Sequence, residues 1–211
     1  MRPSILLLDE PFAALDKNLR LDMQIEVKRI QRLSGTTTIL VTHDQEEALS
    51  LCDRIAVLNQ GRLEQLATPT EIYDRPSSLF VNTFVGTANT IPGVLVSTAG
   101  ERAIVALDDG AQIETRRPIE SMVPGDRVVV CIRPEHLRIA ASGEGIKGTV
   151  EMGLPLDSTI VHEVRAASGR SLKTAEPRAT GMEPRLVGAS VTLVPTQPDA
   201  VGVFRPPADP R

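Results

Sequence analysis

The stretch Ile5-Leu6-Leu7-Leu8-Asp9-Glu10-Pro11 decides the fold that we predict for the first part of the chain. Four apolar residues in a row, with no polar alternation, predict a short strand that is buried on both faces, as at the centre of a parallel sheet. Pro11 ends this strand, because proline cannot donate to the ladder. Asp9 and Glu10 then lie at its carboxyl end, where open α/β sheets bind ligands. The alternative is that the two carboxylates only solvate the end of the strand.

An amphipathic helix and a second strand follow. Asp16 is placed to cap the helix, and Gly35 is placed to end it in the left-handed conformation. The β-branched run Thr36 to Val41 predicts another buried strand. The apolar stripe of the helix has helical spacing and consists of Leu19, Met23, Val27, Ile30 and Leu33.

His43 comes directly after the second strand. If the two strands are parallel neighbours, His43 lies in the same layer as Asp9 and Glu10. In a phosphate-cleaving site, an Asp at a strand end can hold the water shell of Mg²⁺ and a neighbouring Glu can deprotonate the attacking water. A His can hydrogen-bond a terminal phosphate. The alternative for His43 alone is a surface or capping residue.

The remaining signals up to Gly86 are local. Thr42 or Asp44 can cap a short helix that begins at Gln45, and Gly61 can supply the positive φ of a hairpin turn between residues 54–58 and 62–67. Two further short helices are predicted after Thr68, which begins a capping-box pattern, and after Ser77 or Ser78.

Composition excludes several classes of protein. Hydrophobic residues make up 41% and charged residues 24% of the 211 residues, which is close to the globular average. The formal net charge of −4 argues against a nucleic-acid partner. Cys52 and Cys131 have no CxxC spacing, so we expect neither a disulfide framework nor a zinc site. The sequence shows no signal peptide and no membrane span, and we therefore expect a cytoplasmic protein.

From about residue 90 the pattern changes to short β-rich runs separated by turn residues, which predicts an all-β barrel or sandwich. The expected strands are Ile91 to Val96, Arg102 to Leu107, Gln112 to Thr115, Arg127 to Ile132, Gly148 to Met152, Ser158 to Val164, Ser171 to Ala175, Ser190 to Val194 and Val201 to Phe204.

The separated motifs of the first part resemble the ATPase subunit of ABC transporters. The matching pieces are Leu-Leu-Leu-Asp-Glu-Pro (6–11), Ala14-Leu15-Asp16, Ile-Leu-Val-Thr-His-Asp-Gln-Glu-Glu-Ala (39–48), Asp53-Arg54-Ile55-Ala56-Val57 and Gly61-Arg62. In that family they are the Walker B strand, the D-loop, the switch His loop and a closing hairpin. The resemblance implies an α/β fold that is part of a P-loop nucleoside triphosphatase core.

The resemblance also implies residue roles. Asp9 would hold Mg²⁺ through water, Glu10 would be the catalytic base and His43 would contact the γ-phosphate. Asp16 would meet the partner subunit of a homodimer beside the nucleotide. ATP and Mg²⁺ are the cofactors that the family implies.

Three family motifs are missing from the sequence. These are the phosphate loop GxxxxGK[ST], the Gln loop and the Leu-Ser-Gly-Gly-Gln signature. Because all three precede the Walker B strand in the family, we expect a product shortened at its N-terminus, and we expect no tight nucleotide binding by this chain alone. We also expect residues 1–67 to be less stable than the rest, with exposed strand edges and apolar helix faces.

The second part resembles the small OB-like barrels, called TOBE domains, that follow this ATPase in one branch of the family. The similar pieces are Val123-Pro124-Gly125-Asp126 and Ile132-Arg133-Pro134-Glu135-His136, while Gly-Thr-Ala-Asn (86–89) resembles the usual junction that precedes the barrel in this branch. We therefore expect residues 1–67 to belong to the ATPase, 68–89 to be a helical bridge and 90–211 to be a TOBE-like barrel. Arg133 and His136 could take an oxyanion. A structural ion pair of Arg133 with Glu135 is the favoured alternative.

Two functions of different class follow. The first is an importer ATPase subunit for polyamines, opines, iron, sulfate or sugars, which works on the inner face of the membrane. Its partners would be a second copy, two membrane-spanning permease subunits and, indirectly, a periplasmic or extracellular solute-binding protein. The second is a non-catalytic ligand-binding or regulatory TOBE module with a vestigial ATPase segment.

Overall fold

The computed structural model describes residues 4–117, 121–140 and 143–207, with only the backbone described for Lys17 and Asn18. The chain divides into two compact units, Met1–Gly86 (unit 1) and Thr87–Arg211 (unit 2). Among the described residues, the helices lack either the length or the apolar composition needed to span a bilayer.

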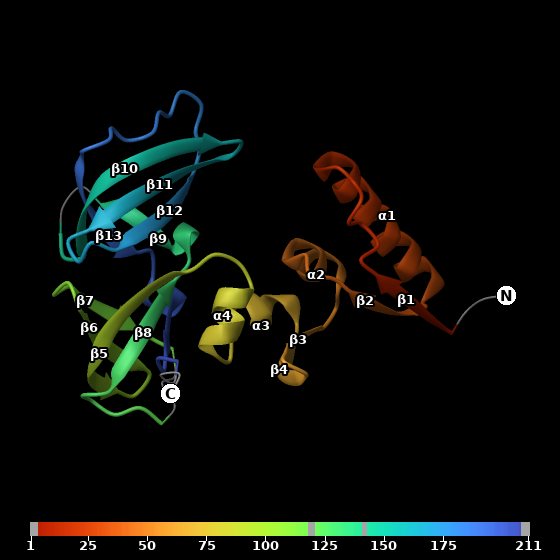
Figure 1. The fold of residues 1–211 in the computed structure, drawn as a ribbon, viewed down its shortest axis with the longest axis horizontal. Helices are drawn as coiled ribbons and strands as arrows, with labels where there is room; N and C mark the ends of the chain where they lie inside the picture. The colour runs from red at the N-terminus through yellow and green to blue at the C-terminus, as the bar shows by residue number, and fades with distance from the viewer. Residues whose placement is uncertain (1–3, 118–120, 141–142, 208–211) are drawn as a thin grey trace. The chain divides into compact units, whose positions relative to one another are not determined.

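The described part of unit 1, residues 4–86, contains two small sheets and four helices. Its elements are β1 (Ile5–Asp9), α1 (Lys17–Ser34), β2 (Thr37–Val41), α2 (Gln45–Leu51), β3 (Ile55–Asn59), β4 (Arg62–Ala67), α3 (Pro69–Asp74) and α4 (Leu79–Phe84). Strands β1 and β2 pair in parallel, with Leu7 opposite Ile39, and α1 connects them (Figure 1). This confirms the predicted βαβ unit. The described parallel sheet has only these two strands, so the predicted P-loop nucleoside triphosphatase core is not shown.

Local signals set the ends of these elements as predicted. The Asp16 carboxylate accepts from Leu19 N at 3.0 Å at the start of α1, and Gly35 ends the helix with φ of 65°. Thr68 and Glu71 form the reciprocal capping box of α3. In the β3–β4 turn, Gly61 has φ of 76° as expected.

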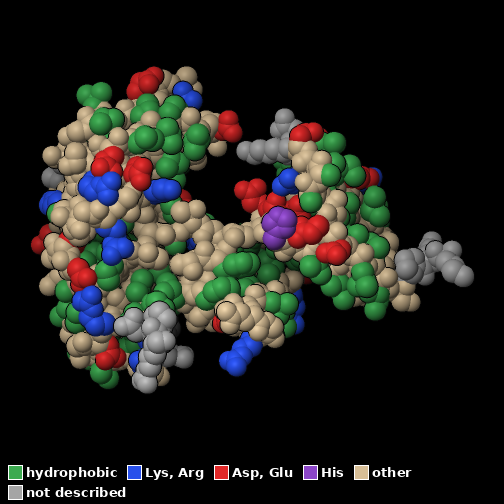
Figure 2. Space-filling view, viewed as in Figure 1, with side chains coloured by type: hydrophobic (Ala, Val, Ile, Leu, Met, Phe, Trp, Pro, Cys, Tyr) green, Lys and Arg blue, Asp and Glu red, His purple; other side chains and the backbone are tan. Residues whose placement is uncertain are grey.

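The prediction that β1 is buried on both faces is wrong. Ile5 is 56% and Leu7 71% exposed, because within the described chain β1 has one strand neighbour. The apolar stripe of α1 is also largely exposed, with Leu33 at 76%. Figure 2 shows hydrophobic side chains exposed along α1.

Unit 2 is built from two five-stranded antiparallel sheets. Its elements are β5 (Asn89–Ala99), β6 (Arg102–Leu107), β7 (Gln112–Thr115), β8 (Arg127–Ile132), η1 (Pro134–His136), β9 (Leu137–Ala140), β10 (Ile146–Leu156), β11 (Thr159–Ala166), β12 (Ser171–Pro177), β13 (Ser190–Pro195), η2 (Pro198–Ala200) and β14 (Val201–Phe204). The strand orders are β12-β11-β10-β13-β9 and β14-β8-β5-β6-β7.

Each of these sheets coils so that its end strands approach each other. The Thr115 hydroxyl on β7 donates to Val201 O on β14 at 2.7 Å, and Ile139 N on β9 donates to the Glu176 carboxylate on β12 at 3.4 Å. The predicted all-β, OB-like character is confirmed. The sequence did not indicate that the strands divide between two sheets, and β9 was not predicted.

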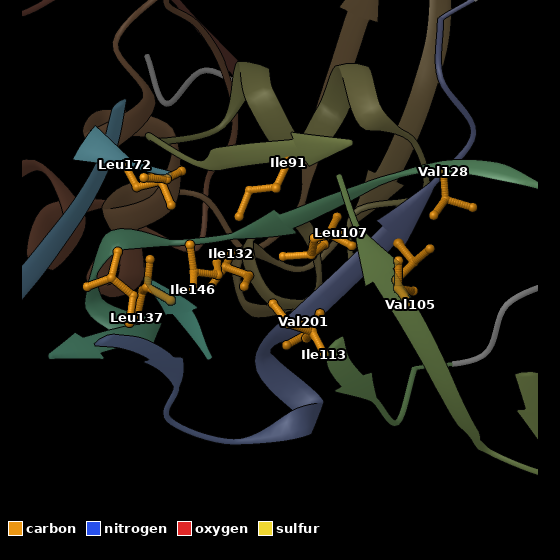
Figure 3. Close-up of a cluster of buried hydrophobic side chains, with 14 of the residues drawn as sticks. Ile91, Val105, Leu107, Ile113, Val128, Ile132, Leu137, Ile146, Leu172 and Val201 are labelled. Carbon is orange, nitrogen blue, oxygen red and sulfur yellow. The ribbon is translucent and has the colours of Figure 1, made fainter. Parts of the chain in front are cut away.

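One apolar core joins the two sheets (Figure 3). Leu137, Ile146 and Leu172 come from one sheet, and Ile132 and Val201 come from the other. All five are at most 1% exposed. Burial of these side chains stabilises unit 2, since large aliphatic side chains contribute about 1.5–3 kcal/mol each when fully buried.

The side chain of Asn89 links the two sheets of unit 2 by hydrogen bonds. Its Nδ2 donates to Ile132 O at 3.1 Å and to Lys173 O at 2.8 Å, and its Oδ1 accepts from Lys173 N at 2.7 Å. Asn89 is only 6% exposed, so water has little access to its side chain. The side chain therefore satisfies backbone groups of β8 and β12 at once.

We expect Asn89→Ala to lower the free energy of unfolding of unit 2 by about 2–4 kcal/mol, because one buried and two partly buried backbone groups lose their partner. Urea unfolding followed through the amide NMR signals of β8 and β12 measures this. Thr90→Ala on the same strand is the matched control and should cost about 0.5 kcal/mol or less. Equal losses in the two variants would show that the Asn89 bonds do not join the sheets.

Candidate functional site

The candidate site lies where β1 and β2 end. The two strands are parallel and in register from Ile5 opposite Thr37 to Asp9 opposite Val41, so their carboxyl ends meet at the same edge. Glu10 N donates to Val41 O at 2.9 Å and thereby extends the pairing by one residue. The residues that follow the two strands are thus held side by side.

Glu10 and His43 form the central pair of the site. His43 Nδ1 lies 2.7 Å from Glu10 Oε1, and the backbone N of His43 donates to the same oxygen at 2.9 Å. The side chain of His43 is 83% exposed and that of Glu10 is 34% exposed. The pair is therefore open to a ligand from solvent.

The backbone of Glu10 is in an unusual conformation. Its φ of 45° is in the left-handed region, which non-glycine residues occupy at a cost of about 1–3 kcal/mol. Pro11 follows directly and fixes the direction of the chain after the strand. Such conformations cluster at functional sites, and here the strained residue is the one that contacts His43.

Hydrogen bonding to His43 lowers the pKa of Glu10 below its ordinary value of 4.5, and the same bond raises the pKa of His43 above 6.5. Asp44 and Glu47 add to the increase for His43 through their charge. At neutral pH Glu10 is therefore held ionised. With Nδ1 occupied by Glu10, a protonated His43 ring presents Nε2–H as a donor for an anion.

The pH range of this pair follows from the two shifts. The His43 contribution to stability is complete below 6.5 and is lost as the pH rises through the raised pKa of His43. The Glu10 contribution is present above 4.5 and is lost as the pH falls through the lowered pKa of Glu10. The Glu10–His43 ion pair therefore contributes fully to stability between pH 4.5 and pH 6.5.

We expect Glu10→Gln to move the titration midpoint of His43 down towards 6.5, because the charge-assisted bond is lost. Proton NMR of the His43 ring against pH measures the midpoint. Glu46→Gln, on the exposed side of α2, should leave it unchanged. The same His43 midpoint in the wild-type and Glu10→Gln chains would contradict the pairing.

Neighbouring polar groups support the pair, and sequence reasoning did not assign them to the site. Thr42 Oγ1 donates to the buried Glu47 carboxylate at 2.8 Å, and it lies 3.4 Å from Glu10 Oε2. Asp44 caps α2 and forms an ion pair with Arg20 of α1 at 2.7 Å. The Thr42–Glu47 bond and the cap of α2 are local, whereas the approach of Thr42 to Glu10 and the Arg20–Asp44 pair join residues distant in sequence. A helical or strand periodicity could not have indicated the two long-range contacts.

Asp9 and Asp16 are not part of this hydrogen-bonded group. Asp9 is exposed at the end of β1, and the Asp16 carboxylate is occupied by the cap of α1. Within the described ranges, no cluster of three or more His, Cys, Asp or Glu side chains could hold a metal ion. The carboxylates and the imidazole suit a Mg²⁺–phosphate group by their chemistry, but they do not form a complete site for it on their own.

An open apolar hollow of about 1260 Å³ adjoins the site in unit 1. Leu8, Val27 and Leu40 are among its apolar lining residues, and His43 also lines it. The small buried apolar cluster of unit 1 comprises Val57, Ile72, Val81 and Val85, and three of these residues also line the hollow.

In the second unit, the residues considered for an oxyanion lie around η1. Arg133 is buried at 5% exposure, Glu135 is exposed and His136 is partly buried. The backbone N of His136 donates to Arg133 O at 2.9 Å. The three side chains thus share a turn without all facing solvent.

Comparison with known proteins adds the following similarities. A family model described as TOBE domain matches residues 130–203. The spermidine/putrescine import ATP-binding protein PotA of Nitratidesulfovibrio vulgaris is 40% identical over 180 residues, which is 82% of this chain and 49% of that protein. The PotA of Ruegeria pomeroyi is 46% identical over 145 residues, covering 69% of this chain and 39% of its own length. This chain thus spans about half the length of the curated relatives it matches, or less.

Among solved structures, the molybdate-binding protein ModG with molybdate bound is similar over 63% of this chain and 99% of that chain. The sequence identity is 16% and the TM-score 0.47. A likeness of this degree is too small to indicate a ligand.

Proposed function

Since this chain corresponds to the C-terminal part of the ABC transporter ATP-binding subunits that carry a TOBE domain, we propose that it works as part of an importer's ATP-binding subunit. The proposed solutes are polyamines, because the relatives are named for spermidine/putrescine import. The observation that carries the proposal is the Glu10–His43 pair at the ends of two parallel strands.

Each proposed role matches the chemistry of its side chain. Glu10, kept ionised by His43, is the proton acceptor for the attacking water, and it must exchange its bond with His43 for that water. His43 Nε2–H is the donor to the terminal phosphate. Asp9 would hold Mg²⁺ through water, and Asp16 would face the nucleotide across a homodimer. Bound Mg–ATP would supply the phosphoryl group that is cleaved.

The remaining half of the site is proposed to come from the phosphate loop, Gln loop and signature of the family, which this sequence does not contain. The open hollow and the exposed faces of β1 and α1 support this, because apolar surface of this extent is normally covered. We propose that the part of the family fold that precedes the Walker B strand packs there. The chain alone would bind ATP weakly and would not hydrolyse it.

The proposed partners are a second copy and two membrane-spanning permease subunits, with a solute-binding protein on the other side of the membrane acting indirectly. The subunit would then work at the cytoplasmic face of the membrane. Unit 2 would serve as its regulatory domain. A non-catalytic regulatory module is the second candidate, and the contrast between the packed core of unit 2 and the exposed unit 1 favours it.

Polyamine uptake tests the proposal. In a joined chain, the part of Nitratidesulfovibrio vulgaris PotA that precedes its matched region is fused in front of this chain. We expect the joined chain to restore labelled putrescine uptake in cells that lack their own ATP-binding subunit. A joined chain that is folded and membrane-associated but restores no uptake would favour the regulatory alternative or another solute.

A further inference from the structure

Gln45 connects the candidate site to the end of unit 1. It is the first residue of α2 and comes two positions after His43. Its Nε2 donates to Phe84 O, and its Oε1 accepts from Gly86 N at 2.6 Å. Both partners lie about forty positions further along the chain, at the point where α4 ends.

The end of α4 needs these two bonds. The last carbonyls of a helix have no partner within the helix, and Phe84 is the last residue of α4. Gly86 has φ of 82° and follows the C-cap residue Val85. A primary amide can donate and accept at the same time, so Gln45 satisfies one group of each kind. A carboxylate at this position could accept only.

The start of α2 is in turn fixed to the site. Asp44 caps the helix by accepting from Glu46 N at 2.9 Å, and its neighbour His43 is bound to Glu10 through both its ring and its backbone. The Glu10–His43 bonds and the Gln45–Gly86 bond are therefore connected through the two backbone steps from His43 to Gln45. Thr87, the first residue of unit 2, follows directly.

We propose that Gln45 is a positioning residue that couples the Glu10–His43 pair to the end of α4 and Gly86, so that a change at the pair alters the segment leading into unit 2. Because coupling between two sites is reciprocal, a change at Gly86 also alters the pair. In the proposed function, this coupling would report the state of the nucleotide site to a regulatory unit, and that role rests on the proposed function. The coupling itself belongs to this chain and can be measured without ATP.

Hydrogen exchange at the Gly86 amide tests the proposal in the full chain. Four chains are compared: wild type, Glu10→Ala, Gln45→Ala and the double variant. We expect Gln45→Ala to speed Gly86 exchange about 5- to 10-fold, because a hydrogen bond is lost. Glu10→Ala should speed it about 5-fold when Gln45 is present and should add nothing in the double variant.

Two further variants make the result specific. Gln45→Glu keeps an acceptor for Gly86 N and loses the donor to Phe84 O. We therefore expect it to retain part of the protection of Gly86 and, with it, the response to Glu10→Ala. Glu46→Gln, the next residue of α2, should change nothing. If exchange in α3 shows that Gln45→Ala unfolds unit 1, the Gly86 exchange rates of Gln45→Glu with and without Glu10→Ala are used to test the coupling instead.

The proposal is overturned if Glu10→Ala has no effect on Gly86, or has the same effect with and without Gln45. A joined chain that fails to hydrolyse ATP would reject the proposed function and leave the exchange result intact. The two failures are therefore distinguishable.

Discussion

Amide hydrogen exchange is expected to be on the order of 100-fold or more faster in β1 and β2 than in β8 and β13, after correction for intrinsic rates. Leu7 in β1 is 71% exposed, whereas Val130 in β8 and Leu193 in β13 are fully buried. Local opening of β1 exposes little further apolar surface and costs little, while opening of β8 breaks the core that joins two sheets.

Mass spectrometry or NMR of the whole chain measures this contrast. Within unit 1, the segment around Val57 and Ile72 provides an internal comparison, because these side chains form a small buried cluster. We expect its protection to lie between those of β1 and β8. Uniform protection along the described chain would contradict our account of unit 1 as a part that needs further cover.

In the joined chain, Glu10→Gln is expected to lower the rate of ATP hydrolysis by about 100-fold or more, because an amide cannot accept a proton from the attacking water. ATP binding should be retained, since Gln has nearly the same shape and the phosphate-binding motifs are unchanged. Steady-state phosphate release and nucleotide binding, measured on the same preparations, separate the two effects.

Glu46→Gln is the matched control for this substitution. It removes an equal charge from the exposed first turn of α2 and should leave turnover unchanged. If Glu10→Gln and Glu46→Gln gave equal turnover, Glu10 would not be the proton acceptor, and its strained backbone would need another explanation.

Features that depend on neighbouring residues in sequence were predictable. Asp16 and Gly35 cap the two ends of α1 as predicted, because capping requires only local geometry. Strand β6 (Arg102–Leu107) has its predicted limits because turn residues lie on both sides. The juxtaposition of Glu10 and His43 was also predictable, since it follows from parallel pairing of two strands joined by a helix.

Features that depend on packing between distant parts of the chain could not be predicted from the sequence. Burial of β1 was predicted from its apolar composition, but burial requires something to pack against, and the described chain provides one strand neighbour. The bonds of Gln45 to Phe84 O and Gly86 N, and the approach of Thr42 to Glu10, join groups that only the tertiary fold brings together. The four-residue strand β9 was not predicted from the sequence, because it directly follows the turn at Pro134–His136.

ATP turnover by this chain alone and by the joined chain, measured side by side, shows whether Glu10 and His43 need the phosphate-binding motifs of the family to work. We predict no turnover by the chain alone, because its Glu10–His43 pair lacks a phosphate-binding partner, and clear turnover by the joined chain. Hydrolysis by the chain alone that Glu10→Gln abolishes would contradict the account, and so would a folded joined chain that binds ATP without hydrolysing it.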